Sequence, residues 1–460
     1  MAKKKRQMIL NLFLNNIGHH EAAWRHPAAE IDQLNDFSYY RKIAVKAEEA
    51  KFDSIFFADR LAVSKEAVQY SAASRLEPLT LLSAISVVTE KIGLIATVST
   101  SFNEPYNLAR KFSSIDHLSK GRAGWNIITS GTDEEARNFN YDKIPDHALR
   151  YRRSKEFLEV ALKLWDSWEE EALIKDKAAG IYADPDKVHR ADHKGEFYQV
   201  RGPLNVSRSP QGRPVLVQAG SSKDGKKFSA EFAEAVFTAQ QTLEEAQIFY
   251  EDVKQRAEGF GRNRNEIKIL PGICPVIGNT EEEAKEKEYR LHHLANPDHS
   301  LSQLSSRIGF DLSGYPLDGP LPELSETGHI RGHQSRTKLI KDLAQRENLT
   351  IRQLLHRLAG GRGHYTISGT AEQIANLLEE WFENGAADGF NIMPQLMGEG
   401  LDDFIEKVLP ILRQKGLFRE NYTGDTLREH YGLGYPASQF STKDNRRSSI
   451  EKVHTSDQIG

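Results

Sequence analysis

The sequence is poor in features that mark several classes of protein. Its 460 residues include one cysteine, Cys274, which excludes an internal disulfide and a zinc or iron–sulfur site built on cysteines within the chain. No apolar run approaches the ~20 residues needed to cross a bilayer, so we expect no transmembrane helix and no membrane partner. Lys and Arg total 61 and Asp and Glu 65, so the net charge of −4 provides no electrostatic drive toward nucleic acid.

Motifs of several enzyme classes are also missing. The first predicted strand is not followed by G-x-G-x-x-G, and the chain contains no Walker A sequence, no H-E-x-x-H and no G-x-S-x-G. His19, His20 and His26 lie in one stretch that lacks carboxylates at ligand spacing, so we expect no metal site.

The amino terminus opens with basic residues 3–6, as a signal peptide does. Asparagines interrupt the apolar run that follows at residues 8–16, and no small-residue cleavage site comes after it. We interpret this segment as a solvated start leading into a buried strand, and we expect a cytoplasmic protein, in agreement with the single thiol.

Short β-rich runs alternate with longer helical stretches along most of the chain. Several runs are continuously apolar, which is typical of parallel strands covered on both faces. Eight such runs in this order favour an α/β fold, a (β/α)₈ barrel, over an open doubly wound sheet. The predicted strands are residues 9–15, 54–58, 92–99, 123–129, 215–219, 235–238, 267–276 and 388–393.

Local signals also predict helix starts and insertions. Asp36 is the expected cap of a helix over 36–50, and Thr242 with Glu245 that of a helix over 243–258. Residues 175–209 and the Gly- and Pro-rich residues 296–336 break the alternation, and we interpret the second segment as a lid or a disordered connection. We therefore expect one barrel over 1–417, with insertions at about 170–210 and 296–360, and a partly mobile extension over 418–460.

Function in such a barrel collects where the strands end at their carboxyl termini. Trp24 follows the first predicted strand and is either a pocket wall or a packed rim residue. Asp59 ends the second, as a hydrogen-bond acceptor for a ligand or as a turn cap. Thr97 lies near the end of the third, where its hydroxyl either lines the interior or satisfies the backbone.

Two further candidate groups follow the fourth and fifth predicted strands. His147 and Tyr151 are four residues apart, so on a helix they share one face near its positive end. The pair either holds a phosphate or a ring, or is an ordinary surface pair. Gly220, Ser221 and Ser222 form a turn before a helical stretch, which is able to wrap N–H and hydroxyl donors around a phosphate.

Taken together, these segments resemble the bacterial luciferase-like flavin monooxygenases, and within them the nitrilotriacetate monooxygenase and dibenzothiophene-sulfone monooxygenase subfamily. The segments run along most of the chain in the family's order, although each segment alone is only weakly specific for the family. The departures from the family pattern are the basic residues 3–6 and residues 301–336, which leave the substrate open. The matching segments are Trp-Arg-His-Pro at 24–27, Phe-Phe-Ala-Asp at 56–59, Leu-Glu-Pro-Leu at 76–79, the run 92–101, Glu104-Pro105, the run 116–126, Ala-Arg-Asn at 136–138, His147 with Tyr151, the run 195–205, Ser-Pro-Gln-Gly at 209–212, Gln-Ala-Gly-Ser-Ser at 218–222 and Ala-Asp-Gly-Phe at 387–390.

The resemblance implies a (β/α)₈ barrel that binds FMN at its carboxyl end, with reduced FMN delivered by a separate NAD(P)H:flavin reductase. It implies that O₂ oxygenates a small organic substrate at or next to N or S, with C–N or C–S cleavage, in a homodimer or homotetramer. Carried over by position, Asp59 and Thr97 line the flavin pocket, and His147 and Tyr151 contact the flavin.

By the same carry-over, Ser221 and Ser222 hold the phosphate. Our hypothesis adds a catalytic role for His147 through its protonation. Two alternatives to this monooxygenase activity stay open. One is a flavin-binding barrel without turnover, and the other is an oxidoreductase that uses the deazaflavin F420.

Overall fold

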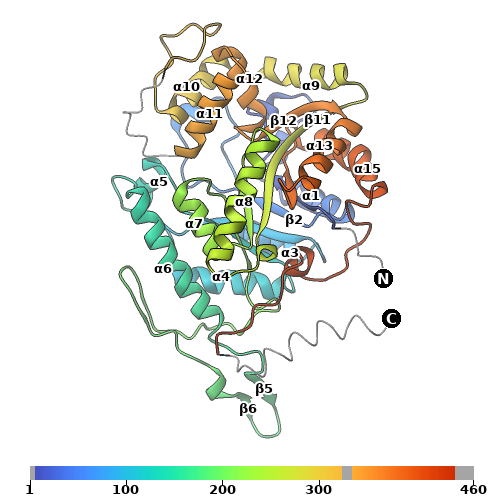
Figure 1. The fold of residues 1–460 in the computed structure, drawn as a ribbon. Helices are drawn as coiled ribbons and strands as arrows, with labels where there is room; N and C mark the ends of the chain where they lie inside the picture. The colour runs from blue at the N-terminus through green and yellow to red at the C-terminus, as the bar shows by residue number, and fades with distance from the viewer. Residues whose placement is uncertain (1–5, 324–333, 441–460) are drawn as a thin grey trace.

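A ring of eight parallel strands forms the centre of the computed structural model, which describes residues 6–323 and 334–440 (Figure 1). The ring runs β1-β2-β3-β4-β9-β10-β11-β13 and returns to β1, and the pairing of β10 with β11 closes it. The fold expected from the sequence is therefore confirmed, and each expected strand is present within two residues of its predicted bounds. The strands are β1 (Ile9–Leu14), β2 (Ser54–Phe57), β3 (Gly93–Ser99), β4 (Ala123–Ile128), β9 (Val215–Gln218), β10 (Ala235–Thr238), β11 (Lys268–Gly278) and β13 (Gly389–Ile392).

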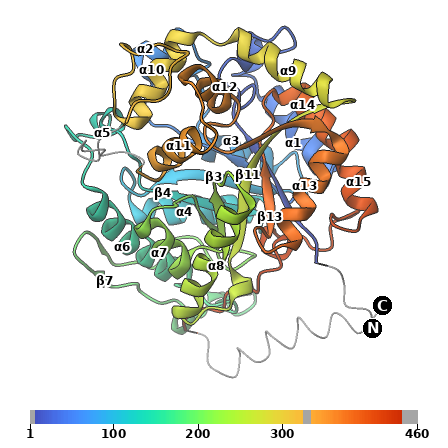
Figure 2. The ribbon, with the colours of Figure 1, turned by 45° about the horizontal axis from the view of Figure 1, so that its top comes forward.

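Helices surround the ring on its outer side (Figure 2). Asp36 caps the first of them, as predicted, by accepting the Ser38 N–H at 2.8 Å. Thr242 likewise caps α8, while the Glu245 carboxylate accepts the N–H of Gln241. The helices around the ring are α1 (Phe37–Glu49), α3 (Pro78–Ser86), α4 (Pro105–Leu118), α6 (His147–Trp165), α7 (Lys223–Phe232), α8 (Leu243–Gly259), α13 (Ala371–Glu383), α14 (Met397–Asp403), the π-helix η5 (Phe404–Val408) and α15 (Leu409–Gln414).

Strand β11 is longer than its neighbours and leaves the ring at its carboxyl end. Its last six residues pair with β12 (Tyr365–Thr370), a strand that the sequence did not reveal. Between them lie α9 (Glu281–Leu294), α10 (Pro297–Ile308), α11 (Gln334–Arg346) and α12 (Ile351–Gly361), drawn above the barrel in Figure 1. Helices α10, α11 and α12 bury apolar side chains against one another in a small core of their own.

The expectation of a continuous loop over residues 296–336 is wrong for 297–308, which form α10. Asn296 caps this helix by accepting the His299 N–H at 2.9 Å, and Pro297 occupies its first turn. Both are local start signals that the Gly and Pro residues after 308 obscured. Residues 324–333 of the segment lie outside the described residues.

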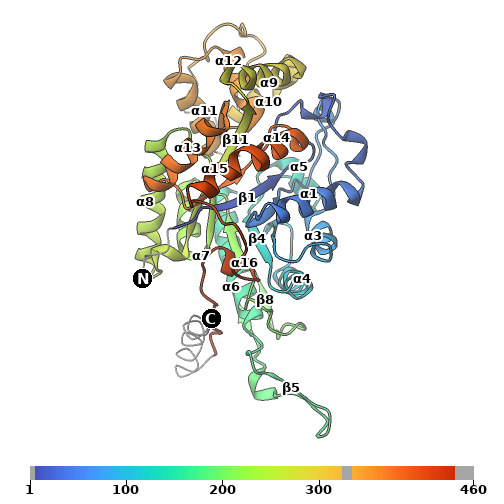
Figure 3. The same ribbon diagram turned by 90° about the vertical axis from the view of Figure 1, so that its right-hand side faces the viewer.

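A second insertion, residues 172–200, forms two small hairpins, β5 (Leu173–Asp176) with β6 (Ile181–Ala183) and β7 (His193–Lys194) with β8 (Gln199–Val200). The first hairpin projects away from the barrel at the end opposite α10 (Figure 3). Its Ile174, Ile181 and Tyr182 are exposed. The remaining short elements are α2 (Lys65–Val68), α5 (Asp133–Arg137), α16 (Leu427–His430) and the 3-10 helices η1 (Ala23–Arg25), η2 (Ile31–Gln33), η3 (Pro185–Lys187) and η4 (Arg264–Glu266).

The carboxyl-terminal segment closes the amino end of the barrel. Leu427 of α16 is fully buried among inward-facing side chains, and carbon atoms added at Gly93 or Gly124 would collide with it. The Tyr431 hydroxyl donates to the Asn11 side chain of β1 at 2.9 Å. The first part of the expected extension therefore packs against the barrel, and residues 441–460 lie outside the described residues.

An ion pair anchors the same segment. Arg428 donates to both carboxylate oxygens of Glu234, which precedes β10, at 2.6 and 3.2 Å. Burial by itself would raise the pKa of Glu234, but the charges of Arg428 and Arg213 outweigh it and lower the pKa to about 2.

This shift predicts a pH-dependent contribution to stability. The unfolded value is 4.5 and the folded value lies below it, so the contribution is full above pH 4.5 and is lost as the pH falls toward 2. Glu234→Gln should lower the free energy of unfolding at pH 7 by on the order of 3 kcal/mol, because it leaves buried guanidinium groups uncompensated. The deficit should narrow between pH 7 and pH 3.5, measured by denaturant unfolding followed by tryptophan fluorescence.

Glu286→Gln is the matched control, because Glu286 is exposed and pairs with Arg290 one turn away on α9. It should change the free energy by less than about 0.5 kcal/mol. A pH-independent deficit for Glu234→Gln would contradict the ionised pair as its source.

Candidate active site

Aromatic side chains occupy the interior of the barrel below its carboxyl end. Phe13 of β1 stacks on Phe56 of β2 at 4.7 Å between ring centroids, and Phe237 of β10 meets both edge-on. His364, just before β12, lies flat on Phe237 at 4.7 Å and 10°. These four rings, the aromatic floor, exclude water from the barrel interior directly beneath the strand ends.

Asp59 lies two residues beyond β2, at the carboxyl end of the barrel. Its carboxylate accepts the N–H of Arg60 at 2.8 Å, so the turn-cap interpretation describes one of its contacts. Burial raises the pKa of Asp59, and the bond from Arg60 and the charge of Arg75 oppose that rise. The second carboxylate oxygen accepts no hydrogen bond from the described residues, so Asp59 retains capacity for another donor.

Thr97 and Asn126 face each other on the adjacent strands β3 and β4. They are register partners, and the Asn126 amide donates to the Thr97 hydroxyl at 2.9 Å. The Asn126 Oδ1 atom is buried and has no hydrogen-bond partner among the described residues. A buried amide oxygen without a donor is costly, so it indicates a place where a ligand N–H belongs.

His147 is the first residue of α6 and Tyr151 lies one turn later. Their rings are 4.9 Å apart, which confirms that the spacing places them on one face. His147 Nδ1 lies 3.1 Å from a carboxylate oxygen of Asp224, at the start of α7. A carboxylate only accepts, so this bond keeps a proton on Nδ1 and leaves Nε2 to exchange protons.

The turn from Gly220 to Asp224 forms a cradle of donors at the start of α7. Ser222 caps the helix by accepting the N–H of Gly225 at 3.1 Å. The N–H groups of residues 221–224 have no acceptor within the described chain. Such a row at a helix start binds anions, because the N–H dipoles and the helix dipole both favour negative charge.

Gly220 is required where it stands. A Cβ atom there would lie 2.4 Å from the Gln218 side-chain amide and 2.9 Å from the Tyr151 hydroxyl. Tyr151 is therefore part of the cradle wall, and its pKa is raised by burial while hydrogen bonding to Ser222 opposes the rise. The Ser221 hydroxyl lies 3.4 Å from that of Thr238, on the next strand β10.

The structure brings all six predicted site residues to one arc of the barrel. They follow or lie on β2, β3, β4 and β9, which are neighbours in the ring. Asp59 and Thr97 are at one end of the arc, and His147, Tyr151, Ser221 and Ser222 at the other. Sequence reasoning missed Asn126 and Asp224, although the polar Asn126 within the otherwise apolar fourth predicted strand was a usable signal.

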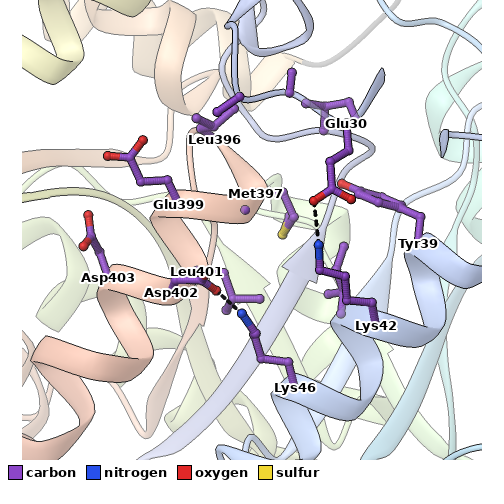
Figure 4. A pocket seen from close by; sticks show the side chains of 15 residues that line it. Glu30, Tyr39, Lys42, Lys46, Leu396, Met397, Glu399, Leu401, Asp402 and Asp403 are labelled. Atoms are coloured by element: carbon purple, nitrogen blue, oxygen red, sulfur yellow. Dashed lines mark hydrogen bonds and ion pairs between the residues drawn. The ribbon is translucent and has the colours of Figure 1, made fainter. Parts of the chain in front are cut away.

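A pocket of about 370 Å³ lies elsewhere (Figure 4). It is a groove between α1 and α14 on the outer side of the ring, and its Lys42 and Lys46 already pair with Glu30 and Asp402. A smaller pocket of about 240 Å³ is walled by Trp24, whose indole N–H donates to the Tyr70 carbonyl oxygen at 3.0 Å. Neither pocket contains a predicted cofactor residue.

The arrangement of the described residues also bears on metal binding and on membrane insertion. Among residues 6–323 and 334–440, no three or more His, Cys, Asp or Glu side chains gather as they would around a metal ion. Over the same residues, every helix is too short or too polar to traverse a lipid bilayer.

Comparison with known proteins identifies relatives over nearly the whole chain. The chain is 49% identical over 442 residues to N-acetyl-S-(2-succino)cysteine monooxygenase of Bacillus subtilis (strain 168), covering 96% of this chain and 100% of the relative. It is 46% identical to nitrilotriacetate monooxygenase component A of Aminobacter aminovorans, covering 94% and 97%. The crystal structure of a riboflavin lyase with a modified FMN and riboflavin superimposes with a TM-score of 0.83 at 34% identity, covering 94% and 97%.

The family model of the luciferase-like monooxygenases matches residues 14–388. The match includes β2 to β11, the insertion that follows β11, and every predicted site residue. The resemblance inferred from the short motifs is thereby confirmed. The chain belongs to the luciferase-like monooxygenase family and is a flavin-dependent monooxygenase.

Proposed function

We propose that the protein is the oxygenase of a two-component system that uses reduced FMN supplied by a separate NAD(P)H:flavin reductase. Its substrate is a small organic molecule oxygenated at or next to N or S, with cleavage of a C–N or C–S bond. One relative is named as component A of its monooxygenase, which supports a second component. The observation that carries the proposal is the donor cradle at the start of α7, beside Tyr151 and His147.

The cradle would hold the FMN phosphate. Ser221 and Ser222 offer hydroxyl groups and residues 221–224 offer N–H groups, and Tyr151 adds a hydroxyl from the wall. A phosphate needs several converging donors and open space beside them. Gly220 leaves that space because it has no side chain. The residues at this end of the arc therefore fit the phosphate group of FMN.

The flavin ring would lie over the aromatic floor, toward Thr97, Asn126 and Asp59. An isoalloxazine ring carries both N–H and carbonyl groups along one edge, and the unpartnered Asn126 oxygen suits the N–H. The aromatic floor suits the flat apolar ring system. The donor set fits FMN, in which the phosphate and the ring lie at opposite ends of the molecule.

Reduced FMN supplies the reaction with O₂, in which one oxygen atom goes to the substrate and the other leaves as water. The task of the protein is to orient flavin and substrate and to keep bulk water out. In the proposed mechanism His147 exchanges a proton at Nε2, while Asp224 holds the opposite nitrogen. Assembly as a homodimer or homotetramer in the cytoplasm, where NAD(P)H is present, belongs to the same proposal.

Substrate-coupled oxygen use tests the function. The full chain, FMN, NADH and a generic flavin reductase should consume O₂ with a substrate panel of amines and thioethers. Mass spectrometry should then detect one added oxygen atom or a dealkylated product. Flavin binding without coupled product would support a barrel without turnover, and tighter binding of F420 than of FMN would support the deazaflavin alternative.

The cradle predicts the effect of Gly220→Ala. The new methyl group would displace the Gln218 amide or the Tyr151 hydroxyl, so affinity for FMN should fall by about tenfold or more through lost phosphate hydrogen bonds. Quenching of flavin fluorescence measures it. Gly259→Ala is the control, because a Cβ there meets nothing within 4 Å; equal flavin affinity of both variants would refute the cradle.

The role of His147 predicts the effect of His147→Gln. This variant keeps a polar side chain but cannot exchange the proton, so kcat for coupled oxygenation should fall by about 10²-fold. Flavin affinity should change by less than about threefold, because the proposed role is in proton exchange and not in holding the flavin. His189→Gln removes another carboxylate-paired histidine, at 2.7 Å from Glu169, and should leave coupling intact; full coupling in His147→Gln would exclude the role.

A further inference from the structure

The segment that follows β1, residues 18–25, bonds directly to the insertion that follows β11, and we call it the first loop. The Glu21 N–H donates to the Ala359 carbonyl oxygen of α12 at 3.1 Å. The Ser300 hydroxyl of α10 donates in turn to the Glu21 carboxylate. The first loop is therefore a place where the barrel and the insertion, drawn above it in Figure 1, are joined.

Three histidines meet at this place, and we call them the histidine joint: His20 of the first loop, His292 of α9 and His356 of α12. His20 Nε2 lies 3.1 Å from His292 Nδ1. The ring of His292 lies flat on that of His356, at 4.8 Å between centroids and 7° between planes. His20 is buried and the other two are half-buried. The three rings thus form a continuous contact from the barrel to two helices of the insertion.

The hydrogen bonds of the joint fix the positions of its protons. The Ala22 N–H donates to His20 Nδ1 at 3.1 Å, and a backbone N–H is only a donor. His20 Nδ1 is therefore unprotonated, and the proton of the neutral ring is on Nε2, from which it is donated to His292 Nδ1. The proton of His292 is then on its own Nε2. Both rings are neutral in this arrangement, each in one defined tautomer.

An additional proton on either ring breaks one of these bonds. On His20 Nδ1 it would oppose the Ala22 N–H, and on His292 Nδ1 it would oppose the His20 N–H. Protonation of both His292 and His356 would also place two cations in parallel at 4.8 Å, where they repel each other. The joint as it stands therefore requires neutral histidines.

Two carboxylates face the joint, and both accept hydrogen bonds from other groups. Glu288, one turn before His292 on α9, accepts from the Gln395 amide at 3.1 Å and from the Ser368 hydroxyl. Glu21 accepts from the Ser300 hydroxyl. The basic groups that face the joint are His293 on α9, Arg352 on α12 and Arg362 just beyond α12.

Burial is the main cause that lowers the pKa of all three histidines. The charges of the other two rings and of Arg362 lower the pKa of His20 further, to about 3. The charge of Glu288 opposes the fall at His292, whose pKa is about 4. The ordinary value is 6.5, so each ring binds a proton more readily once the joint has opened.

We propose that the histidine joint is a pH-sensitive device that holds the insertion on the first loop while the three rings are neutral and releases it when they are protonated. It goes beyond the proposed function, because it involves neither the flavin nor the substrate. Closure is full above pH 6.5 and weakens as the pH falls from 6.5 toward 4, because the open form then takes up protons that the closed form excludes. Release would admit water to the carboxyl end of the barrel, where coupled oxygenation depends on its exclusion.

The size of the effect follows from the two pKa values of each ring. Between pH 7.5 and pH 5.5, protonation favours the open form of a histidine with an ordinary pKa by about tenfold, whereas a closed ring with a pKa of about 4 or below gains almost nothing. His20 and His292 together should therefore raise the opening constant by about a hundredfold, and protonation of His356 adds to this.

Hydrogen exchange of the full chain, followed by mass spectrometry at pH 7.5 and pH 5.5, tests the proposal. After correction for the pH dependence of the chemical exchange rate, residues 18–25, 288–294 and 351–361 should lose about a hundredfold in protection at pH 5.5. Residues 105–118 of α4 serve as the internal reference and should lose none. This comparison uses the unaltered chain, so it holds even where a variant folds poorly.

His292→Asn is the decisive variant, because its side-chain oxygen can still accept the His20 N–H but cannot be protonated. In this variant the loss of protection at pH 5.5 should shrink by about tenfold, since one of the titrating groups is gone. His117→Asn is the matched control. His117 is an exposed histidine on α4 that contacts the Ser207 carbonyl oxygen at 3.0 Å, and its removal should leave the hundredfold loss unchanged.

Three results would overturn the proposal. The first is equal protection of the joint at both pH values in the unaltered chain. The second is an undiminished loss in His292→Asn, which would assign the pH dependence to other groups. The third is an equal loss in α4, which would mean that acid destabilises the whole chain and not the joint.

Discussion

The architecture depends on how β11 distributes its backbone hydrogen bonds. Its first four residues pair with β10 and close the ring, its middle pairs with β13, and its last six pair with β12. A strand in a closed barrel normally has two partners, and β11 gains a third by extending past the ring. The same element therefore seals the barrel and carries the insertion to a position over its carboxyl end, where the candidate site lies.

The two ends of the barrel differ in the residues that fill them. At the amino end, Leu427 and Tyr431 fill the interior. There the Asn11 side-chain amide donates to the Asn391 amide oxygen at 3.1 Å. At the carboxyl end, unpartnered polar groups accumulate, among them the Asn126 oxygen and the N–H groups of residues 221–224. The unpartnered groups at the carboxyl end prepare it for a ligand.

Much of the fold could be predicted because its signals are local. Buried parallel strands are apolar on both faces, so the eight ring strands stand out in the sequence, and Asp36 and Thr242 mark helix starts by side-chain chemistry alone. Strand β12 escaped because it lies outside the ring and is only half-buried, so it lacks a continuous apolar run. The closure of the amino end by α16 was not predicted, because its contacts join residues that are far apart in the chain.

The same distinction holds for the candidate site. The spacing of His147 and Tyr151 and the Ser222 cap are local, and sequence reasoning found them. The bond from His147 to Asp224, in contrast, spans 77 residues. Groups that converge only through tertiary structure leave no pattern at short range, so this contact required the folded chain.

The pairing of Tyr431 with Asn11 has a consequence for biosynthesis. The two residues are 420 positions apart, so the buried amide of the first strand gains this hydrogen bond only after 431 residues have been made. A ribosome delivers the chain from its amino terminus, and the barrel base therefore stays open until α16 has been made. The nascent protein must remain protected from aggregation until this late segment reaches the first strand.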